Sequence, residues 1–412
     1  MTGTIDGIAV PPAVERHFPP EVARRLVDLR RDLHRHPELS WQEKETSDRL
    51  IAALASFGIA DVARVGRTGL VARMPGRDRS APVVALRGDI DALPITENTG
   101  LPFTSEHPGV MHACGHDVHA SWAVGAAMLL AAAPATGDVL IVFQPAEEVG
   151  DGARAMLASG ALANVAAIFG GHVDRRFEVG QVVAQAGALA ASTDTFEIEI
   201  VGSGAHGARP HESADPIVAA AAIVTALQTL VSRRLDPAQP GVVTVGTINA
   251  GTASNIISDR ARMSGTIRAT TVAARTLLTR ELASLVTGVA TAYGVSATTI
   301  LSGGTPPIVN PERMASLAAR AVGRVLGDAA LVPLGTTNMG GEDFAVYMER
   351  IPGCFLRIGA REPGGRVIAA HSPGYYAAEG ALFIGAAVLA EAARVASAAL
   401  AAQPLADPPA SA

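Results

Sequence analysis

Residues 195–201 read TFEIEIV, and this stretch marks a change in the strand pattern of the chain. Apolar and polar residues alternate with period two, which predicts a strand with one buried and one exposed face. Helical and strand patterns follow it at 216–234, 242–249, 260–269, 272–293 and 296–301. The order β-α-β-β-α-β is that of a ferredoxin-like domain. We therefore expect an α+β domain over residues 188–303.

Strands outside this domain have a different pattern. Apolar runs without alternation, at Val83–Leu86, Val139–Phe143 and Ala166–Phe169, are separated by helical patterns. Such strands predict a mixed, mostly parallel sheet flanked by helices. The sequence thus predicts an α/β protein with an inserted domain. The α/β domain would comprise residues 1–187 and 304–402, and residues 403–412 would form a disordered tail.

Composition excludes several classes of protein. The 412 residues are 49% hydrophobic and 17% charged, which is typical of a globular chain. Lys and Arg number 33 against 39 Asp and Glu, so the net charge of −6 argues against a nucleic-acid partner. The apolar stretches at 122–133 and 381–402 are short or carry charges, which favours core helices over membrane spans. With only two cysteines and no signal-peptide pattern, we expect a cytoplasmic protein.

The densest group of chemically active residues lies in Met111–His119, which reads MHACGHDVH. Its possible metal ligands are His112, Cys114, His116, Asp117 and His119. Thiolate, imidazole and carboxylate groups are the usual ligands of zinc and similar divalent ions. The segment predicts a metal-binding loop, and a solvated loop with incidental histidines is the alternative.

Further candidates follow predicted strands. Gln144–Glu148 reads QPAEE, so one glutamate could bind a metal while its neighbour acts as a base on water. A charged helix start is the alternative. His172 and His371 are single histidines, each of which would more often be structural than a ligand. Because open α/β sheets gather their sites at the carboxyl ends of strands, we expect these segments to converge on one site.

Two aspartates in RGDIDALPI also follow a predicted strand. Asp89 and Asp91 could orient ligand histidines through hydrogen bonds, or they could fix their own turn.

Eight motifs occur in order along the chain: RGDIDALPI (87–95), MHACGHDVH (111–119), QPAEE (144–148), GAHGARPH (204–211), NIISD (255–259), GTIRA (265–269), GGEDF (340–344) and HSP (371–373). With them, residues 20–395 resemble the aminoacylase and carboxypeptidase family of metallopeptidases. Within that family the chain is similar to the amidohydrolase branch, which includes N-acyl-amino-acid amidohydrolases, hippurate hydrolases and auxin-conjugate hydrolases.

The resemblance implies a catalytic domain that holds two divalent metal ions per subunit. Matching motifs give the ligands as Cys114, His116, Glu148, His172 and His371, with Glu147 as general base. Sulfur as a ligand favours zinc, cobalt or nickel, and the resemblance adds manganese, so the choice of metal stays open.

The resemblance also implies that the inserted domain is a lid or dimerisation domain. Its His206 would polarise the scissile carbonyl. Asn255 and Arg268 match positions near the substrate or the contact between subunits, and a homodimer or higher oligomer is expected. In dimeric relatives the lid histidine reaches the partner's site. Three other histidines, His112, His119 and His211, are expected to support the site or the fold.

The expected reaction is hydrolysis of the amide bond of N-acyl-L-amino acids, with acetyl, benzoyl or longer acyl groups, by metal-activated water. One alternative is a dipeptidase or aminoacyl-peptide hydrolase of the same family, and another is a catalytically silent metal-dependent binding protein. A Cys114 nucleophile is a weaker hypothesis, because it leaves both glutamates, His172 and His371 without a role.

Overall fold

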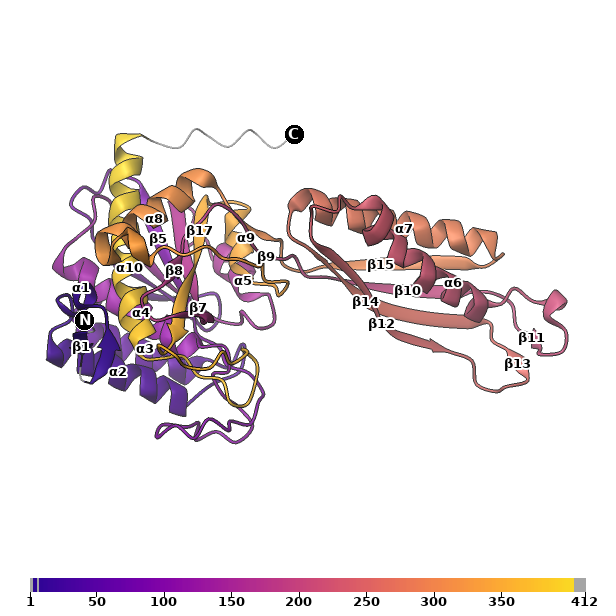
Figure 1. Cartoon of the computed structure of the whole chain (residues 1–412), viewed down its shortest axis with the longest axis horizontal. Helices are drawn as coiled ribbons and strands as arrows, with labels where there is room; N and C mark the ends of the chain where they lie inside the picture. Colours follow the sequence, from indigo (N-terminus) through magenta and orange to yellow (C-terminus); the bar gives the residue numbers. More distant parts are fainter. Residues whose placement is uncertain (1–2, 6, 404–412) are drawn as a thin grey trace. The chain divides into compact units, whose positions relative to one another are not determined.

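The computed structural model describes residues 3–5 and 7–403 (Figure 1). They form two compact units. The first contains the chain up to Gly187, Asn310–Gly335 and the chain from Val346, and the second contains Ala188–Val309 and Thr336–Ala345. Of the expected tail at 403–412, only Gln403 lies within the described residues.

A seven-stranded mixed sheet forms the centre of the first unit. Its strands, in spatial order, are β3 (Val62–Val65), β4 (Gly69–Met74), β6 (Val139–Gln144), β5 (Val83–Asp89), β7 (Val165–Glu178), β17 (Gly353–Arg361) and β8 (Val182–Val183). The central strands β6, β5, β7 and β17 run parallel, and the outer pairings are antiparallel. β5 and β17 are buried along almost their whole length, as expected of strands with both faces covered.

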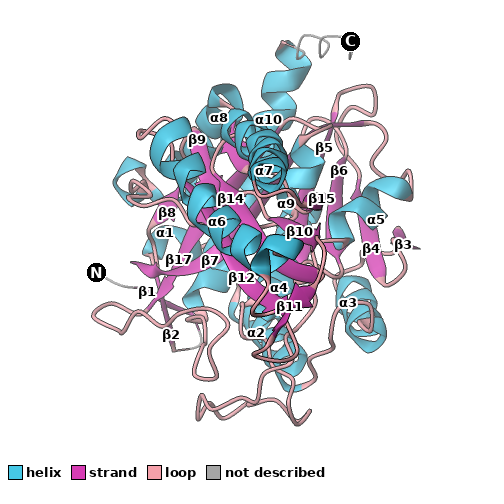
Figure 2. Ribbon diagram, turned by 90° about the vertical axis from the view of Figure 1, so that its right-hand side faces the viewer, coloured by secondary structure: helices cyan, strands magenta, loops and turns pink. Residues whose placement is uncertain are grey.

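Helices flank this sheet, as the cyan ribbons around the magenta strands in Figure 2 show. They are α1 (Pro12–Glu15), α2 (Pro20–Arg35), α3 (Lys44–Ser56), α4 (His116–Ala132), α5 (Gly152–Ala158), α8 (Glu312–Leu326), α9 (Phe344–Met348) and α10 (Gly380–Ala402). α4 and α10 pack against each other and against β5 and β7. A short 3-10 turn, η3 (Asp328–Ala330), and the hairpin β1 (Gly3–Ile5)–β2 (Ile8–Val10) complete the unit.

The second unit is a four-stranded antiparallel sheet. Its strands, in spatial order, are β12 (Gly241–Ala250), β14 (Arg260–Ala269), β10 (Asp194–Val201) and β15 (Ser296–Gly303). In chain order this arrangement is 2-3-1-4, as in a ferredoxin-like domain. β10 has the alternating burial that its sequence predicts. The predicted α/β class, with an inserted ferredoxin-like domain, is confirmed.

Two helices cover one face of this sheet (Figure 1). They are α6 (Pro216–Thr229), which a π-helical turn η2 (Leu230–Arg234) extends, and α7 (Val272–Ala292). Two ribbons and a turn complete the smaller elements: β11 (Ala205–His206) with β13 (Ile256–Ile257), β9 (Gly187–Ala190) with β16 (Ile308–Asn310), and η1 (Pro210–Glu212).

The segment Thr336–Ala345 belongs to the second unit, whereas it falls within the range 304–402 predicted for the α/β domain. Backbone hydrogen bonds explain the difference. Ala190 and Asn338 form a β-bridge, and the Ala191 N–H donates to the carbonyls of Asn338 and Gly340.

Each unit has its own hydrophobic core, and each core packs against one long apolar helix. Pro216–Arg234 and Gly380–Ala402 are long and apolar enough to span a membrane. α10 is buried along most of its length in the first core, while α6 turns Ala219, Ile223 and Leu227 into the second. Packing inside the protein therefore explains the apolar character of α10, whereas α6 buries one apolar face and leaves Ile217 and Val218 exposed.

Candidate metal centre

Three parallel strands bring the predicted ligands of the first unit to one edge of the sheet. Asp89 at the end of β5 pairs with Gln144 at the end of β6. Arg87 pairs with Gly170 of β7, which places His172 level with Asp89 two residues further on. His172 lies inside β7, because that strand continues to Glu178 instead of ending before the histidine. The strand register thus gathers segments that lie far apart in the sequence.

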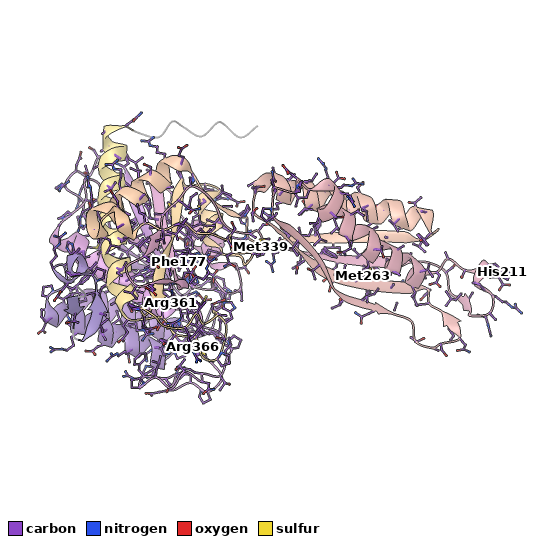
Figure 3. All side chains as sticks on the ribbon, viewed as in Figure 1. Phe177, His211, Met263, Met339, Arg361 and Arg366 are labelled. Atoms are coloured by element: carbon purple, nitrogen blue, oxygen red, sulfur yellow. The ribbon has the colours of Figure 1, made fainter. Side chains whose placement is uncertain are left out.

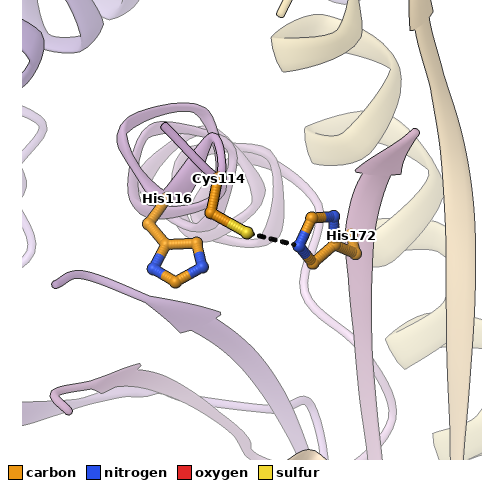
Figure 4. A group of neighbouring side chains, drawn as sticks. All are labelled: Cys114, His116 and His172. Atoms are coloured by element: carbon orange, nitrogen blue, oxygen red, sulfur yellow. Dashed lines mark hydrogen bonds between the residues drawn. The ribbon is translucent and has the colours of Figure 1, made fainter. Parts of the chain in front are cut away.

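Six side chains form three overlapping groups, and within each group the ligand atoms lie within 4.8 Å of one another. His116 is the first residue of α4, Cys114 lies two residues before it, and the Cys114 thiol lies 3.2 Å from His172 Nε2 (Figure 4). Glu148 Oε1 lies 3.8 Å from His116 Nε2, and Glu148 Oε2 lies 3.4 Å from His371 Nε2. The groups are Cys114–His116–His172, Cys114–Glu148–His371 and His116–Glu147–Glu148. One sulfur, three imidazoles and a carboxylate make a donor set suited to zinc-like divalent ions.

Hydrogen bonds fix the tautomers of two of these histidines. His116 Nδ1 donates to the Asp91 carbonyl at 2.9 Å, and His172 Nδ1 donates to the Val173 carbonyl at 2.6 Å. Each bond leaves the lone pair on Nε2, the atom that faces the cluster, as in metal-binding histidines. Among the described residues, the buried His116 Nε2 and Glu148 Oε1 have no hydrogen-bond partner. The cluster therefore presents unsatisfied donor atoms that a divalent cation fits.

The electrostatics also favour a cation. Burial, followed by the neighbouring Glu148, raises the pKa of the Cys114 thiol well above its usual value, so the thiolate needs a positive charge beside it. Burial lowers the pKa of His172, which keeps the imidazole neutral and able to act as a ligand. Burial likewise raises the pKa of Glu148, to about 7.

Glu147 lies beside the cluster on a strained turn. Its Oε2 is 3.9 Å from His116 Nε2, and its side chain is 10% exposed. The preceding residue, Ala146, has a φ of 53°, a left-handed conformation that costs energy outside glycine. Two buried carboxylates hold the turn: Glu43 accepts from the Ala146 N–H at 2.9 Å, and Asp91 accepts from the Glu148 N–H at 3.0 Å.

Two other residues of MHACGHDVH, His119 and Asp117, form hydrogen bonds and ion pairs with the residues that surround the cluster. His119 Nδ1 donates to Asp89 at 2.6 Å, and His119 Nε2 accepts from the Val173 N–H at 3.0 Å. Asp117 points to an ion pair with Arg30 at 2.9 Å and to His34 at 2.8 Å. Both residues therefore use their polar atoms within the fold.

His112 is buried, and burial lowers the pKa of its ring to about 4. Neither of its ring nitrogens has a hydrogen-bond partner among the described residues.

Glu43 had no signal in the sequence that pointed to the site, and Arg87 stood out only as the first residue of the RGDIDALPI motif. Arg87 forms a buried ion pair with Asp89, which in turn accepts from His119. Glu43 precedes α3 and lies a hundred residues from the turn that it holds. Only the pairing of strands and the packing of α3 bring these charges to the site.

The remaining predicted residues lie in the second unit. His206 pairs with Ile256 across the β11–β13 ribbon, and the Gly207 N–H donates to the Asn255 carbonyl, so His206 and Asn255 are neighbours. Arg268 lies near the other end of β14, about 27 Å from Arg260 at ~3.4 Å per residue. His211 is exposed in the turn η1 next to this ribbon (Figure 3).

Candidate soft and hard metal ligands beside a further carboxylate, at the carboxyl ends of parallel strands, are the groups that a metal-dependent hydrolase needs. Residues 85–395 match the peptidase family M20/M25/M40, and the chain belongs to this family. It is 43% identical to an N-acetylcysteine deacetylase of Bacillus subtilis, over 81% of this chain and 88% of that one. It is 39% identical to the IAA-amino acid hydrolase ILR1-like 2 of Arabidopsis thaliana, over 90% and 84% of the two chains.

A solved structure agrees with these matches. The YXEP protein of Bacillus subtilis, a dinuclear metal-binding peptidase of the M20 family, superimposes with a TM-score of 0.80. It is 38% identical, and the match covers 91% of this chain and 98% of that one. The protein is thus a family M20 amidohydrolase, as the sequence motifs predict.

Proposed function

We propose that the protein hydrolyses the amide bond of N-acyl-L-amino acids to a carboxylic acid and a free amino acid. The observation that carries the proposal is the cluster of Cys114, His116, Glu148, His172 and His371 with Glu147 beside it. The similarity to an N-acetylcysteine deacetylase and to an IAA-amino acid hydrolase supports this substrate class.

The five clustered residues would hold two divalent ions of manganese, zinc, cobalt or nickel. Such ions lower the pKa of a water molecule toward 7 and polarise a carbonyl group. Glu147 takes the proton of the attacking water at a carboxylate oxygen and passes it to the leaving nitrogen. The held turn at Ala146 fixes where this carboxylate lies.

His206 would stabilise the negative charge that develops on the carbonyl oxygen. The Ala208 N–H donates to His206 Nδ1 at 3.0 Å, so in the neutral ring the proton is on Nε2. An exposed imidazole with a fixed N–H donor is suited to this task.

We further propose that the protein works as a homodimer. Asn255 and Arg268 would bind the carboxylate of the substrate. Yet β14 spans about 27 Å from Arg260 to Arg268, which is longer than an N-acyl amino acid. His206 and Asn255 lie at the separate β11–β13 ribbon, whose strand β13 precedes Arg260 in the chain. The two ends of one lid domain therefore serve different active sites. The unpaired edge strand β12, with Val242 and Ile248 exposed, offers a surface for a second copy.

A mixed dimer tests this arrangement. We expect subunits with His206→Ala and subunits with Glu147→Gln to be nearly inactive alone and to regain activity when they are co-expressed and purified as a heterodimer. One site of that heterodimer combines an intact Glu147 with the partner's intact His206. A heterodimer as inactive as its parents would contradict the exchange of His206 between subunits.

The reduced thiol required at Cys114 supports a cytoplasmic location. Release of the amine from N-acetyl-L-cysteine, N-acetyl-L-methionine, hippurate and a dipeptide tests the reaction. Each substrate is measured with metal-free protein and again after addition of manganese, zinc, cobalt or nickel. Metal-restored cleavage of the acyl-amino acids is expected. Cleavage of the dipeptide alone would favour the peptidase alternative, to which the family description points.

A further inference from the structure

A buried arginine connects the strand of one candidate ligand to the loop of another. Arg175 follows His172 by three residues in β7 and is 3% exposed. Its side chain reaches the segment 362–379, which joins β17 to α10 and contains neither helix nor strand. The segment begins directly after Arg361 and contains Arg366, both of which are labelled in Figure 3. His371 also belongs to this segment.

The guanidinium makes contacts at four points along this part of the chain. Nη1 donates to the Tyr376 carbonyl at 3.1 Å and to the Ala360 carbonyl at 3.2 Å. Nη2 donates to the Arg366 carbonyl at 2.8 Å and to the Glu362 carboxylate at 3.0 Å. The guanidinium carbon also lies 4.3 Å from the centre of the Tyr376 ring. The fork of an arginine can bridge several acceptors in this way, and a lysine cannot.

His371 itself is weakly held by its surroundings. Its side chain is 53% exposed, and its backbone has a φ of 63°. Two backbone hydrogen bonds near it, from His371 N–H to Ala113 and from Asn98 N–H to Pro373, fix only the middle of the segment. Tyr376 and Arg366, which Arg175 grips, lie on either side of the histidine. Other hydrogen bonds also hold the two ends of the loop, from the Gly364 N–H to Glu178 and from the Ala378 N–H to the Ala360 carbonyl. Arg175 ties Arg366 and Tyr376, on the two sides of His371, to one guanidinium.

We propose that Arg175 is a positioning residue for His371, and that it pre-forms the part of the metal centre made by Cys114, Glu148 and His371. This inference rests on the proposed role of His371 as a metal ligand. β7 keeps His172 in place through its pairing with β5 and β17, whatever residue stands at 175. Replacement of Arg175 should therefore displace His371 more than His172.

Titration of metal-free full-length protein with Co²⁺, followed by calorimetry and visible absorption, tests the proposal. The variants are Arg175→Ala, Arg175→Lys and His371→Ala, and Arg176→Ala is the matched control. Arg176 is the neighbouring residue, 38% exposed, and pairs with Asp174. We expect two classes of Co²⁺ site in the unchanged protein. His371→Ala and Arg175→Ala should weaken the same class, the latter by about 10–100-fold. Arg175→Lys should weaken it too, and Arg176→Ala should leave both classes unchanged.

The outcomes separate the two hypotheses. If His371→Ala binds Co²⁺ like the unchanged protein, the ligand assignment in the proposed function is wrong. If His371→Ala weakens one class and Arg175→Ala does not, the positioning role is wrong. Equal loss of both classes in Arg175→Ala would show a general structural role and would also overturn the proposal. If circular dichroism shows that Arg175→Ala is unfolded, the Arg175→Lys variant tests the positioning role instead. An Arg175→Lys variant that binds Co²⁺ with the affinity of the unchanged protein would refute that role.

Discussion

Replacement of Glu43 tests whether a buried carboxylate outside the motifs holds the turn that carries Glu147. The Glu43 side chain is fully buried and accepts two hydrogen bonds, from the Ala146 N–H at 2.9 Å and from the Thr68 hydroxyl at 2.7 Å. Glu43→Ala leaves both donors buried without a partner, at about 1–3 kcal/mol each. We therefore expect the free energy of unfolding to fall by about 3–5 kcal/mol.

The same change should affect catalysis. Ala146 adopts its left-handed conformation while Glu43 holds its N–H, and relaxation of the turn would move the Glu147 carboxylate. A displacement of about 1 Å can lower a rate by about a hundredfold. We expect kcat to fall by that order while KM changes little, because binding of the substrate does not depend on the proton transfer.

Two further variants make this prediction decisive. Glu43→Gln keeps the size and one carbonyl acceptor, and its amide can donate to the Thr68 hydroxyl, so a loss of only about 1 kcal/mol is expected. Glu45→Ala removes a 68% exposed carboxylate from the same helix, and should change stability by less than about 0.5 kcal/mol. Urea unfolding gives the stabilities, and steady-state kinetics give kcat and KM. If Glu43→Ala matched Glu45→Ala in both measurements, the reasoning would be refuted.

Three other predictions follow from the site and the fold. Glu147→Gln should abolish turnover while elemental analysis shows an unchanged metal content, and an active variant would exclude Glu147 as the base. His206→Ala should lower kcat about 10²–10³-fold with the metal content unchanged, and metal loss would contradict its role at the carbonyl. Burial raises the pKa of Asp138, but the Gly76 N–H and Arg73 outweigh burial and hold this pKa below its usual value. The stabilisation that Asp138 contributes is therefore full above its unfolded-state pKa of about 3.9, and it is lost as the pH falls through the folded-state pKa. Asp138→Asn should therefore be less stable by about 1–2 kcal/mol at pH 7 in urea unfolding, and the difference should shrink below pH 4.

Local patterns were enough to predict the elements of the inserted domain and three strands of the larger sheet. The alternation at 195–201 and the apolar run at Val139–Phe143 correspond to β10 and β6, because burial on one face or on two leaves a different period in the sequence. The ferredoxin-like order followed from the sequence of elements alone. The extra residues of β5 and β7 could not be predicted, since Asp89 and His172 are polar residues held in strands by pairing with their neighbours.

The candidate ligands were also accessible from the sequence, but of the residues that support them only Asp89, Asp91 and His119 were. Metal chemistry restricts a ligand to a few residue types, so Cys114 and His116 stand out where they occur together. The residues that orient them obey no such restriction. His116 donates a hydrogen bond to the backbone carbonyl of Asp91, and any residue at that position could accept it.

Distance along the chain is the second reason why the residues that hold the candidate site could not be predicted from the sequence. Glu43 acts on Ala146, and Arg175 acts on Tyr376, across separations that only the folded sheet closes. In both cases a buried charge from a rigid element grips the backbone of a turn or loop whose own conformation is strained, at Ala146 or at His371. A loop without secondary structure holds a side chain less accurately than a packed helix or strand does, so a charge anchored beside such an element can supply the accuracy. Glu147 and His371 are carried by backbone in the left-handed region, at Ala146 and at His371, and the charges that hold these segments are Glu43, just before α3, and Arg175 of β7.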